Sequence, residues 1–324
     1  MTTMNKNIKI VFMGTPEFAV ASLKKIYESG FDIVGVVTSQ DKPAGRGQKI
    51  KLSAIKIFAE EKGLRIFQPS NLKDETFIKE LQELNSDLFL VVAFRMLPEA
   101  VWKIPKKGTI NLHGSLLPKY RGAAPINWAI INGESKTGVT TFFINDKIDT
   151  GNILFSEEIE ISEDESAGDL HDEMMVIGAS LLEKTAIAVI NNNFNEKVQT
   201  DLIDSSGLKA APKIFKEDCR LKLYDSTEKV YNMIRGLSPY PTAFIELVSP
   251  KNEHYNLKIF KAQKEMILHE LKVGTIVTDG KSRVSIVLID GFIHLQEIQL
   301  TSKKKMSISE FLRGFQIDRH WSVM

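Results

Sequence analysis

The chain has 324 residues, of which 43% are hydrophobic and 26% are charged, as in ordinary globular proteins. This length exceeds what one hydrophobic core usually accommodates, so two domains are expected. No apolar run approaches the roughly 20 residues of a membrane span, and none near the amino terminus has signal-peptide length. The single cysteine, Cys219, excludes an intrachain disulfide and a Cys-x-x-Cys metal pair. The expected location is therefore cytoplasmic.

The net charge of +1 is distributed unevenly along the chain. From Leu208 to the end, 19 Lys and Arg stand against 13 Asp and Glu, a balance of +6. The preceding residues hold the remaining 23 against 28, a balance of −5. A basic carboxyl-terminal part has two interpretations, a lysine-rich solvated face or a surface for a polyanionic partner.

The first half of the chain alternates short apolar runs with helical patterns. Strands are expected at Ile8–Met13, Asp32–Thr38, Arg65–Phe67, Asp87–Ala93 and Thr109–Leu112. Helices are expected from Pro16, which suits a first helical position, after Ser53 and over Lys73–Leu84. The run at Asp87–Ala93 is nearly all apolar, which is typical of a central parallel strand. This β-α-β-α order predicts an α/β fold with a doubly wound, mostly parallel sheet, in which ligands bind at the carboxyl ends of the strands.

The next part predicts strands at Gly138–Ile144 and Ile153–Ile161 and a long helix at Asp169–Ile190. In residues 191–213 the periodicity stops, and Asn, Ser, Gly and Pro dominate, as in an interdomain linker. The expected division is a catalytic domain over residues 1–190, a linker over 191–210 and a second domain over 211–324.

The second domain begins with an expected helix at Ser226–Arg235 and continues in short alternating segments. These segments are Ala243–Val248, Asn256–Ala262, Gly274–Thr278, Ser282–Leu288 and Gly291–Gln299. Their spacing predicts a small β-barrel of the oligonucleotide-binding (OB-like) type, although a β-sandwich has a similar pattern.

One segment combines a carboxamide, an imidazole and a turn: 111-NLHGSLLPKYRGAAP-125. Asn111 and His113 are two residues apart at the end of an expected strand, so their side chains point to the same side. A carboxamide and an imidazole on one face can both donate to a developing oxyanion. Ser115–Pro118 then forms a turn whose backbone amides are expected to meet the polar edge of a ligand.

A carboxylate further along the chain completes the candidate set. Asp149 precedes Thr150-Gly151 in an expected turn between two strands, where it can face the same cleft and favour the charged form of His113. Each residue alone also has a structural interpretation, because a strand-end His, an Asn before a turn and an Asp-Thr-Gly tripeptide are all common. The other five histidines share no such context and are interpreted as structural.

The ordered string Asn-x-His-Gly-Ser-Leu-Leu-Pro-x-x-Arg-Gly-x-x-Pro, followed by Asp-Thr-Gly, resembles the signature of folate-dependent formyltransferases. These enzymes transfer a formyl group from 10-formyltetrahydrofolate to an amine. The resemblance implies a catalytic trio of Asn111, His113 and Asp149. It also implies that a turn lies against the folate, formed by Ser115, Leu116, Leu117 and Pro118. No metal is required for this chemistry, and the sequence shows no metal-ligand cluster.

Branches of this family differ in the amine that receives the formyl group. The glycinamide ribonucleotide branch resembles only the first domain, at about 200 residues, and this chain is longer. The sugar-nucleotide branch also carries a second domain and shares a version of His-Gly-Ser-Leu-Leu-Pro-Lys-Tyr-Arg-Gly. The methionyl-tRNA branch shares that string too, and three further stretches of this chain favour it.

The first stretch, 41-DKPAGRGQKIKLS-53, carries the cations Lys42, Arg46, Lys49 and Lys51 among glycines. Such a composition is typical of a mobile, solvated surface loop. Cations on a glycine-rich loop can also follow phosphates or enter an RNA groove. The stretch resembles the loop that the methionyl-tRNA branch places at the acceptor stem.

The second stretch is the basic run Lys303, Lys304 and Lys305, interpreted either as a solvated hairpin or as a site for tRNA phosphates. The third is residues 211–244, which resemble the opening of the second domain in the methionyl-tRNA branch. The resemblance therefore covers essentially the whole chain and implies a monomer that formylates initiator methionyl-tRNA. Two alternatives stay open, a sugar-nucleotide formyltransferase and a non-catalytic RNA-binding protein on the same scaffold.

The chain departs from the family at Ala93-Phe94-Arg95, where Ala-Tyr-Gly is common. This segment is expected to line the pteridine pocket.

Overall fold

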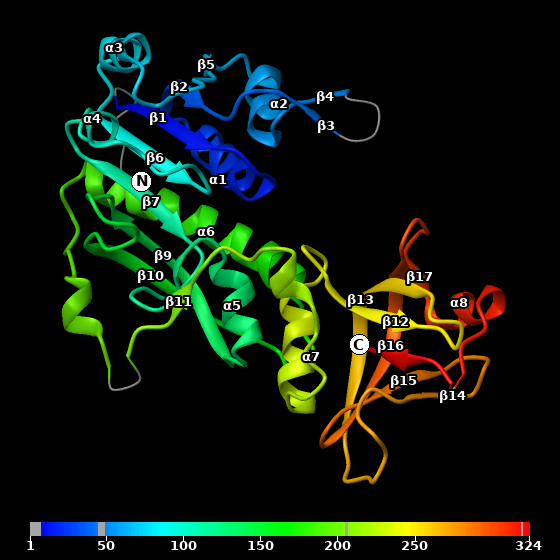
Figure 1. The fold of residues 1–324 in the computed structure, drawn as a ribbon. Helices are drawn as coiled ribbons and strands as arrows, with labels where there is room; N and C mark the ends of the chain where they lie inside the picture. Colours follow the sequence, from blue (N-terminus) through cyan, green and yellow to red (C-terminus); the bar gives the residue numbers. More distant parts are fainter. Residues whose placement is uncertain (1–7, 45–48, 205–206, 319) are drawn as a thin grey trace. The chain divides into compact units, whose positions relative to one another are not determined.

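The computed structural model describes residues 8–44, 49–204, 207–318 and 320–324. For residues 43, 44 and 49 it describes the backbone alone. Two compact units are present (Figure 1). The first consists of Met1–Gly122, Thr137–Ile159 and His171–Ala210. The second consists of Ala123–Lys136, Glu160–Leu170 and Ala211–Met324. The expected boundaries at residues 190 and 210 stay a prediction.

The first unit is built on a seven-stranded sheet in the order β10-β9-β7-β6-β1-β2-β5. Its strands are β1 (Lys9–Gly14), β2 (Asp32–Val37), β5 (Ile66–Phe67), β6 (Leu88–Val92), β7 (Thr109–His113), β9 (Lys136–Phe143) and β10 (Ile153–Glu160). The pairs from β7 through β6, β1 and β2 to β5 are parallel, whereas β9 is antiparallel to β7. The strand order changes direction between β1 and β6, so a crevice is expected beyond the carboxyl ends of these strands.

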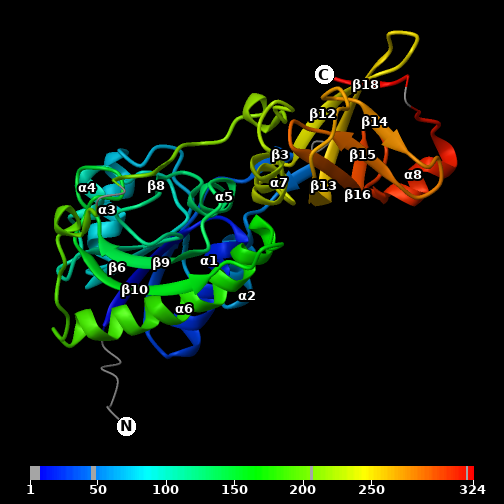
Figure 2. The same ribbon diagram turned by 90° about the horizontal axis from the view of Figure 1, so that it is seen from below.

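Helices cover both faces of this sheet (Figure 2). They are α1 (Glu17–Glu28), α2 (Ala54–Glu61), α3 (Glu75–Glu83), α4 (Glu99–Trp102) and α6 (Ala167–Ile190). Phe77 and Leu81 of α3 and Val101 of α4 join one core with alternate residues of the strands, such as Val11 and Phe89. On the opposite face, α6 passes so close to β7 that a Cβ added at Gly178 would lie 2.9 Å from the Leu112 side chain. The doubly wound, mostly parallel sheet is therefore confirmed.

A short ribbon follows β2, formed by β3 (Lys42–Ala44) and β4 (Lys49–Lys51). Its two ends are tied together because the hydroxyls of Thr38 and Ser53 lie 2.8 Å apart and Asp41 pairs with Lys56 at 2.5 Å. The Lys56 ammonium holds the pKa of the Asp41 carboxyl below its usual range. The described part of this stretch is therefore an exposed antiparallel ribbon with anchored ends.

The second unit contains an antiparallel sheet in the order β14-β15-β16-β13-β12-β18, with β17 added to β16. The strands are β12 (Ala243–Val248), β13 (His254–Met266), β14 (Ile276–Thr278), β15 (Val284–Val287), β16 (Gly291–Leu300), β17 (Met306–Ser307) and β18 (Ser322–Val323). An antiparallel bridge between Thr275 and Ser322 joins the two ends of this order. The sheet is thus a nearly closed barrel, which confirms the expected barrel and not a sandwich.

The remaining elements are β8 (Arg121–Gly122), α5 (Pro125–Ile131), η1 (Gln199–Leu202), β11 (Ala210–Ala211), η2 (Glu217–Cys219), α7 (Thr227–Gly236) and α8 (Ile308–Gly314). Ser226 caps α7 by accepting from the Lys229 amide, and a capping box of Ser307 and Glu310 begins α8. No helix within the described residues is long and apolar enough to cross a bilayer.

Candidate active site

The candidate site lies at the carboxyl end of β7. Asn111 pairs in register with Val91 of β6 and Phe142 of β9, and His113 pairs with Thr140 of β9. Asn111 is half-buried and His113 is 6% exposed. Because residues i and i+2 of a strand point to the same face, these two side chains lie on one side of the sheet, as expected.

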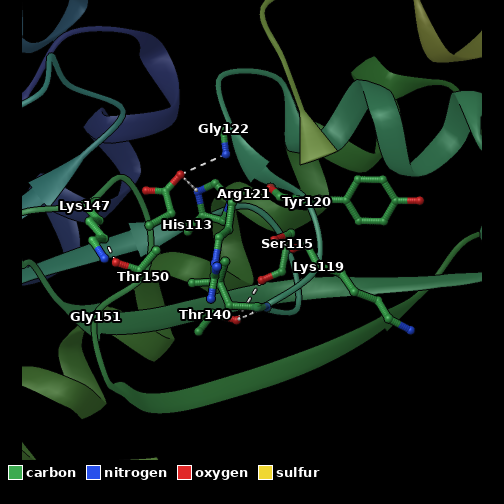
Figure 3. A network of polar contacts seen from close by, with 12 residues as sticks. His113, Ser115, Lys119, Tyr120, Arg121, Gly122, Thr140, Lys147, Thr150 and Gly151 are labelled. Atoms are coloured by element: carbon green, nitrogen blue, oxygen red, sulfur yellow. Dashed lines mark hydrogen bonds and ion pairs between the residues drawn. The ribbon is translucent and has the colours of Figure 1, made fainter. Parts of the chain in front are cut away.

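One nitrogen of the His113 ring is committed to the backbone. Its Nε2 lies 2.8 Å from the carbonyl oxygen of Tyr120 (Figure 3). A carbonyl oxygen can only accept, so Nε2 must carry a hydrogen and donate it. The second nitrogen, Nδ1, is therefore where His113 gains or loses its proton.

Asp149 faces that second nitrogen. Its Oδ2 is 3.8 Å from Nδ1 of His113, and the two side chains are 14% and 7% exposed. The separation is longer than a hydrogen bond, so the pair attracts through charge when His113 is protonated. The same Oδ2 accepts a 2.9 Å hydrogen bond from the Gly122 amide, which fixes the carboxylate.

The turn that carries Asp149 requires its glycine. Asp149 has a positive φ of 53°, which is uncommon for a residue with a side chain. A Cβ added at Gly151 would lie 1.6 Å from the Phe143 carbonyl oxygen. Glycine is thus required at the third position of Asp-Thr-Gly because the backbones of Gly151 and Phe143 approach closely, whereas the first position supplies the carboxylate.

The turn at Ser115–Pro118 is held by its own hydrogen bonds and includes a cis peptide bond between Leu117 and Pro118. The Ser115 hydroxyl is fully buried and donates to the Lys119 carbonyl at 2.7 Å. The Leu117 amide donates to Thr140 Oγ1 at 3.2 Å, and that hydroxyl donates to the Ser115 carbonyl at 2.7 Å. The expectation that this turn offers its amides to a ligand is therefore wrong for Leu117, whose amide is already used.

Sequence reasoning missed several polar partners of the site. Arg121 donates to Oε1 of Gln199 from Nε at 3.1 Å and from Nη2 at 2.8 Å. The amide nitrogen of Gln199 donates to the carbonyls of Asp149 and Gly151 at 3.0 and 2.7 Å. Gln199 lies inside the segment expected to be a linker, and no local pattern distinguishes it there. Burial lowers the pKa of the Arg121 guanidinium, and the charge of Asp149 opposes that shift.

The segment that departs from the family follows β6 directly. Ala93 has a positive φ of 47°, and the Arg95 guanidinium donates to the carbonyls of Ser70 and Pro69 at 3.1 and 2.7 Å. The same guanidinium stacks 5.5 Å from the centre of the Phe94 ring. These contacts fix the Phe94-Arg95 segment at the carboxyl end of a central strand.

The candidate RNA-binding cations fall into two groups. Lys42 and Lys51 are exposed and lie opposite each other in the β3–β4 ribbon, whereas Arg46 and the Lys49 side chain lie outside the described residues. Lys303, Lys304 and Lys305 are exposed in the turn between β16 and β17. Lys305 pairs with Glu297 at 2.7 Å, so part of its charge is already compensated.

A carboxamide and a His–carboxylate pair at the carboxyl edge of a doubly wound sheet define an enzyme site suited to stabilising an oxyanion and moving a proton. No cluster of three or more His, Cys, Asp or Glu suited to a metal ion occurs in the part of the chain that the structure describes.

Comparison with known proteins identifies the family. A family model described as formyl transferase matches residues 6–185, and one described as the formyl transferase C-terminal domain matches residues 213–316. A methionyl-tRNA formyltransferase of Bacteroides thetaiotaomicron is 48% identical over 312 residues, covering 96% of this chain and 97% of that protein. One of Flavobacterium psychrophilum is 50% identical over 310 residues, covering 95% and 96%. The chain belongs to the formyl transferase family.

Solved structures share the fold at lower identity. The sugar 3N-formyl transferase WlaRD, crystallised with dTDP and 5-N-formyl-THF, has a TM-score of 0.63 and 24% identity over 92% of this chain and 99% of that chain. HypX from Aquifex aeolicus, in complex with tetrahydrofolic acid, has a TM-score of 0.61 and 18% identity over 96% of this chain and 48% of that chain. Both of these proteins were thus crystallised with a folate derivative.

The close approach at Gly151 predicts a specific cost for a methyl group. Gly151→Ala should lower the free energy of unfolding by roughly 1–3 kcal/mol, because the Phe143 backbone must move to admit the Cβ. Gly314→Ala is the matched control, since a Cβ there meets nothing within 4 Å. Urea unfolding followed by circular dichroism measures both variants. Equal stability of the two would contradict the described packing of the Asp149 turn.

Proposed function

We propose that the chain transfers the formyl group of 10-formyltetrahydrofolate to the α-amino group of methionyl-initiator tRNA, for translation initiation. The observation that carries this proposal is the similarity, over nearly the whole chain, to relatives named methionyl-tRNA formyltransferase. Those relatives are 48% and 50% identical over 96% and 95% of the chain. Three sugar formyl transferases of known structure are 24%, 23% and 17% identical to this chain, so they support the shared fold and not the sugar substrate.

The acceptor amine needs little activation. A free α-amine titrates near about 8, so a neutral fraction exists at pH 7. Its nitrogen attacks the formyl carbon and forms a new carbon–nitrogen bond, after which the bond to the folate nitrogen breaks. The amine gives up a proton, and the leaving folate nitrogen takes one up. The difficult part is the negative charge that develops on the formyl oxygen.

Asn111 and His113 are placed to stabilise that charge. The carboxamide of Asn111 can donate, and it is only half-buried at the end of β7. Because Nε2 of His113 already donates to Tyr120, the hydrogen on Nδ1 is the one that His113 can offer. We therefore assign Nδ1 of His113 as the donor and the proton-transfer position.

Asp149 lies beside Nδ1 of His113. Its carboxylate faces Nδ1 at 3.8 Å and is fixed by the Gly122 amide. A carboxylate at this distance attracts the imidazolium when His113 is protonated and can help to move the proton of the amine toward the leaving nitrogen.

The folate position follows from the segments beside Asn111 and His113. We place the folate against the turn of Ser115, Leu116, Leu117 and Pro118 and beside Phe94-Arg95. Both segments follow strands at one edge of the sheet. Hydrogen bonds hold the turn internally and to Thr140 of β9, and Phe94-Arg95 is held by the Arg95–Ser70 bond and by ring stacking. A rigid turn suits a planar ligand, because little conformational entropy is lost when the ligand binds.

The tRNA is assigned to cations on both units. Lys42 and Lys51 of the ribbon, with Arg46 and Lys49 of the same stretch, are assigned to the acceptor stem. Lys303, Lys304 and Lys305 are assigned to backbone phosphates. Such contacts position a nucleic acid without reading its sequence. A single protomer and a cytoplasmic location stay predictions.

The catalytic assignment predicts a large loss of rate without a loss of folding. Asn111→Ala should lower the single-turnover rate of formylation of initiator methionyl-tRNA by about 10²–10³, the usual effect of removing one oxyanion donor. Asp149→Asn should also lower this rate, because a neutral amide does not stabilise the imidazolium. Asn193→Ala, at an exposed position after α6, is the control. If Asn111→Ala formylates the tRNA at the wild-type single-turnover rate, Asn111 does not take part in the mechanism.

The ribbon assignment predicts a salt-dependent defect in tRNA binding. Replacing Lys42 and Lys51 together by Ala should weaken affinity for initiator methionyl-tRNA. It should also reduce the slope of log affinity against log salt by about 2, roughly one unit per phosphate contact. The matched control replaces Lys73 and Lys79, which are exposed near and on α3. Filter binding between about 50 and 200 mM salt measures both. An unchanged slope would rule out phosphate contacts from the ribbon.

A further inference from the structure

A buried glutamine connects the two segments that hold Asp149. Gln199 begins η1 and is 2% exposed. Its side chain makes four hydrogen bonds, two with Arg121 and two with the backbone carbonyls of Asp149 and Gly151. The carboxamide thus spans the β8 segment on one side and the turn between β9 and β10 on the other.

The chemistry of these partners fixes the orientation of the amide. An arginine side chain can only donate, so the end facing Arg121 must be the oxygen. Carbonyls can only accept, so the end facing Asp149 and Gly151 must be the NH₂ group. Oε1 accepts two bonds and Nε2 donates both of its hydrogens, so the carboxamide is fully satisfied. A glutamate in this place would keep the first pair of bonds and lose the second.

The bonds form a closed ring around the Asp149 carboxylate. That carboxylate accepts from the Gly122 amide, Gly122 is bonded covalently to Arg121, and Arg121 donates to Gln199. Gln199 returns to the Asp149 carbonyl. Because Asp149 has a φ of 53°, its backbone favours other conformations unless its surroundings hold it. Gln199 supplies that restraint on both sides of Thr150.

The charges near Asp149 explain why its exact place matters. Two titratable or charged groups that interact with it are His113 of β7 and Arg121 of β8. Arg121 donates to a neutral amide through Nε and Nη2, so its charge acts on Asp149 without a direct hydrogen bond between them. A shift of about 1 Å in the position of the carboxylate changes its electrostatic attraction for Nδ1 of His113, while the fold stays nearly the same.

We infer that Gln199 is a positioning residue for the reaction: it holds the Asp149 carboxylate against Nδ1 of His113 through the backbone on both sides of Thr150. This inference rests on the proposed function, because it assigns Gln199 to the same proton-transfer pair. Gln199 touches neither the formyl group nor the amine, and it acts through Asp149.

The test compares variants that remove different ends of the carboxamide. Gln199→Met removes all four bonds with a side chain of similar length. Gln199→Glu keeps an acceptor for Arg121 but cannot donate to the carbonyls of Asp149 and Gly151. Gln82→Met, at an exposed position of α3, is the matched control. The full chain is assayed with initiator methionyl-tRNA and 10-formyltetrahydrofolate to give kcat and KM, and its thermal unfolding is measured in parallel.

The expected result is a loss of kcat of roughly 10–100-fold in Gln199→Met and in Gln199→Glu, with KM for tRNA changed less than about twofold. A residue that only stabilises the fold would lower the melting temperature and leave the kcat of the folded fraction unchanged.

Three results would overturn the inference: wild-type kcat in Gln199→Met, a change confined to KM, or a loss of kcat that equals the unfolded fraction of the variant. If Gln199→Met does not fold, the kcat of Gln199→Glu tests the inference instead. An inactive wild-type chain would instead reject the proposed function, so the two failures are distinguishable.

Discussion

The site depends on one hydrogen bond, from the Gly122 amide to the carboxylate of Asp149. This bond fixes the negative charge opposite Nδ1 of His113, whose other nitrogen already donates to Tyr120. The absence of a side chain at Gly151, the left-handed backbone of Asp149 and the four bonds of Gln199 all hold that carboxylate. Moving the carboxylate would weaken its attraction for a protonated His113, and with it the proposed proton transfer.

The scaffold separates chemistry from recognition. The groups proposed to react are few, and they lie at the edge of a sheet, where positions are well defined. The described cations assigned to tRNA, Lys42, Lys51, Lys303, Lys304 and Lys305, are exposed on a short ribbon and a barrel turn, where salt screens them and each contributes little. This division suits a large polyanionic substrate, because many weak contacts give affinity while one small site performs the transfer.

Sequence periodicity predicted most strands and helices because each buries an apolar face. The strand expected at Ala243–Val248, for example, begins and ends at the same residues in the structure. The short helix at Pro125–Ile131 was missed, since seven residues show too little periodicity.

The motif placed Asn111, His113 and Asp149 together at one sheet edge, and the structure brings His113 and Asp149 within 3.8 Å. Gln199 and the backbone partners Tyr120 and Gly122 escaped prediction, because their roles arise from contacts between residues far apart in sequence. Carbonyls and amides also leave no side-chain signature.

The most direct measurement is a transfer assay with labelled 10-formyltetrahydrofolate and three acceptors in parallel: initiator methionyl-tRNA, elongator methionyl-tRNA and an amino-sugar nucleotide. The wild-type chain and Asp149→Asn are compared at equal folded concentration. The account predicts label on the initiator tRNA alone, and a large loss of that label in the variant. Label on the sugar nucleotide would contradict the proposed substrate, and undiminished label in the variant would contradict the role of the His113–Asp149 pair.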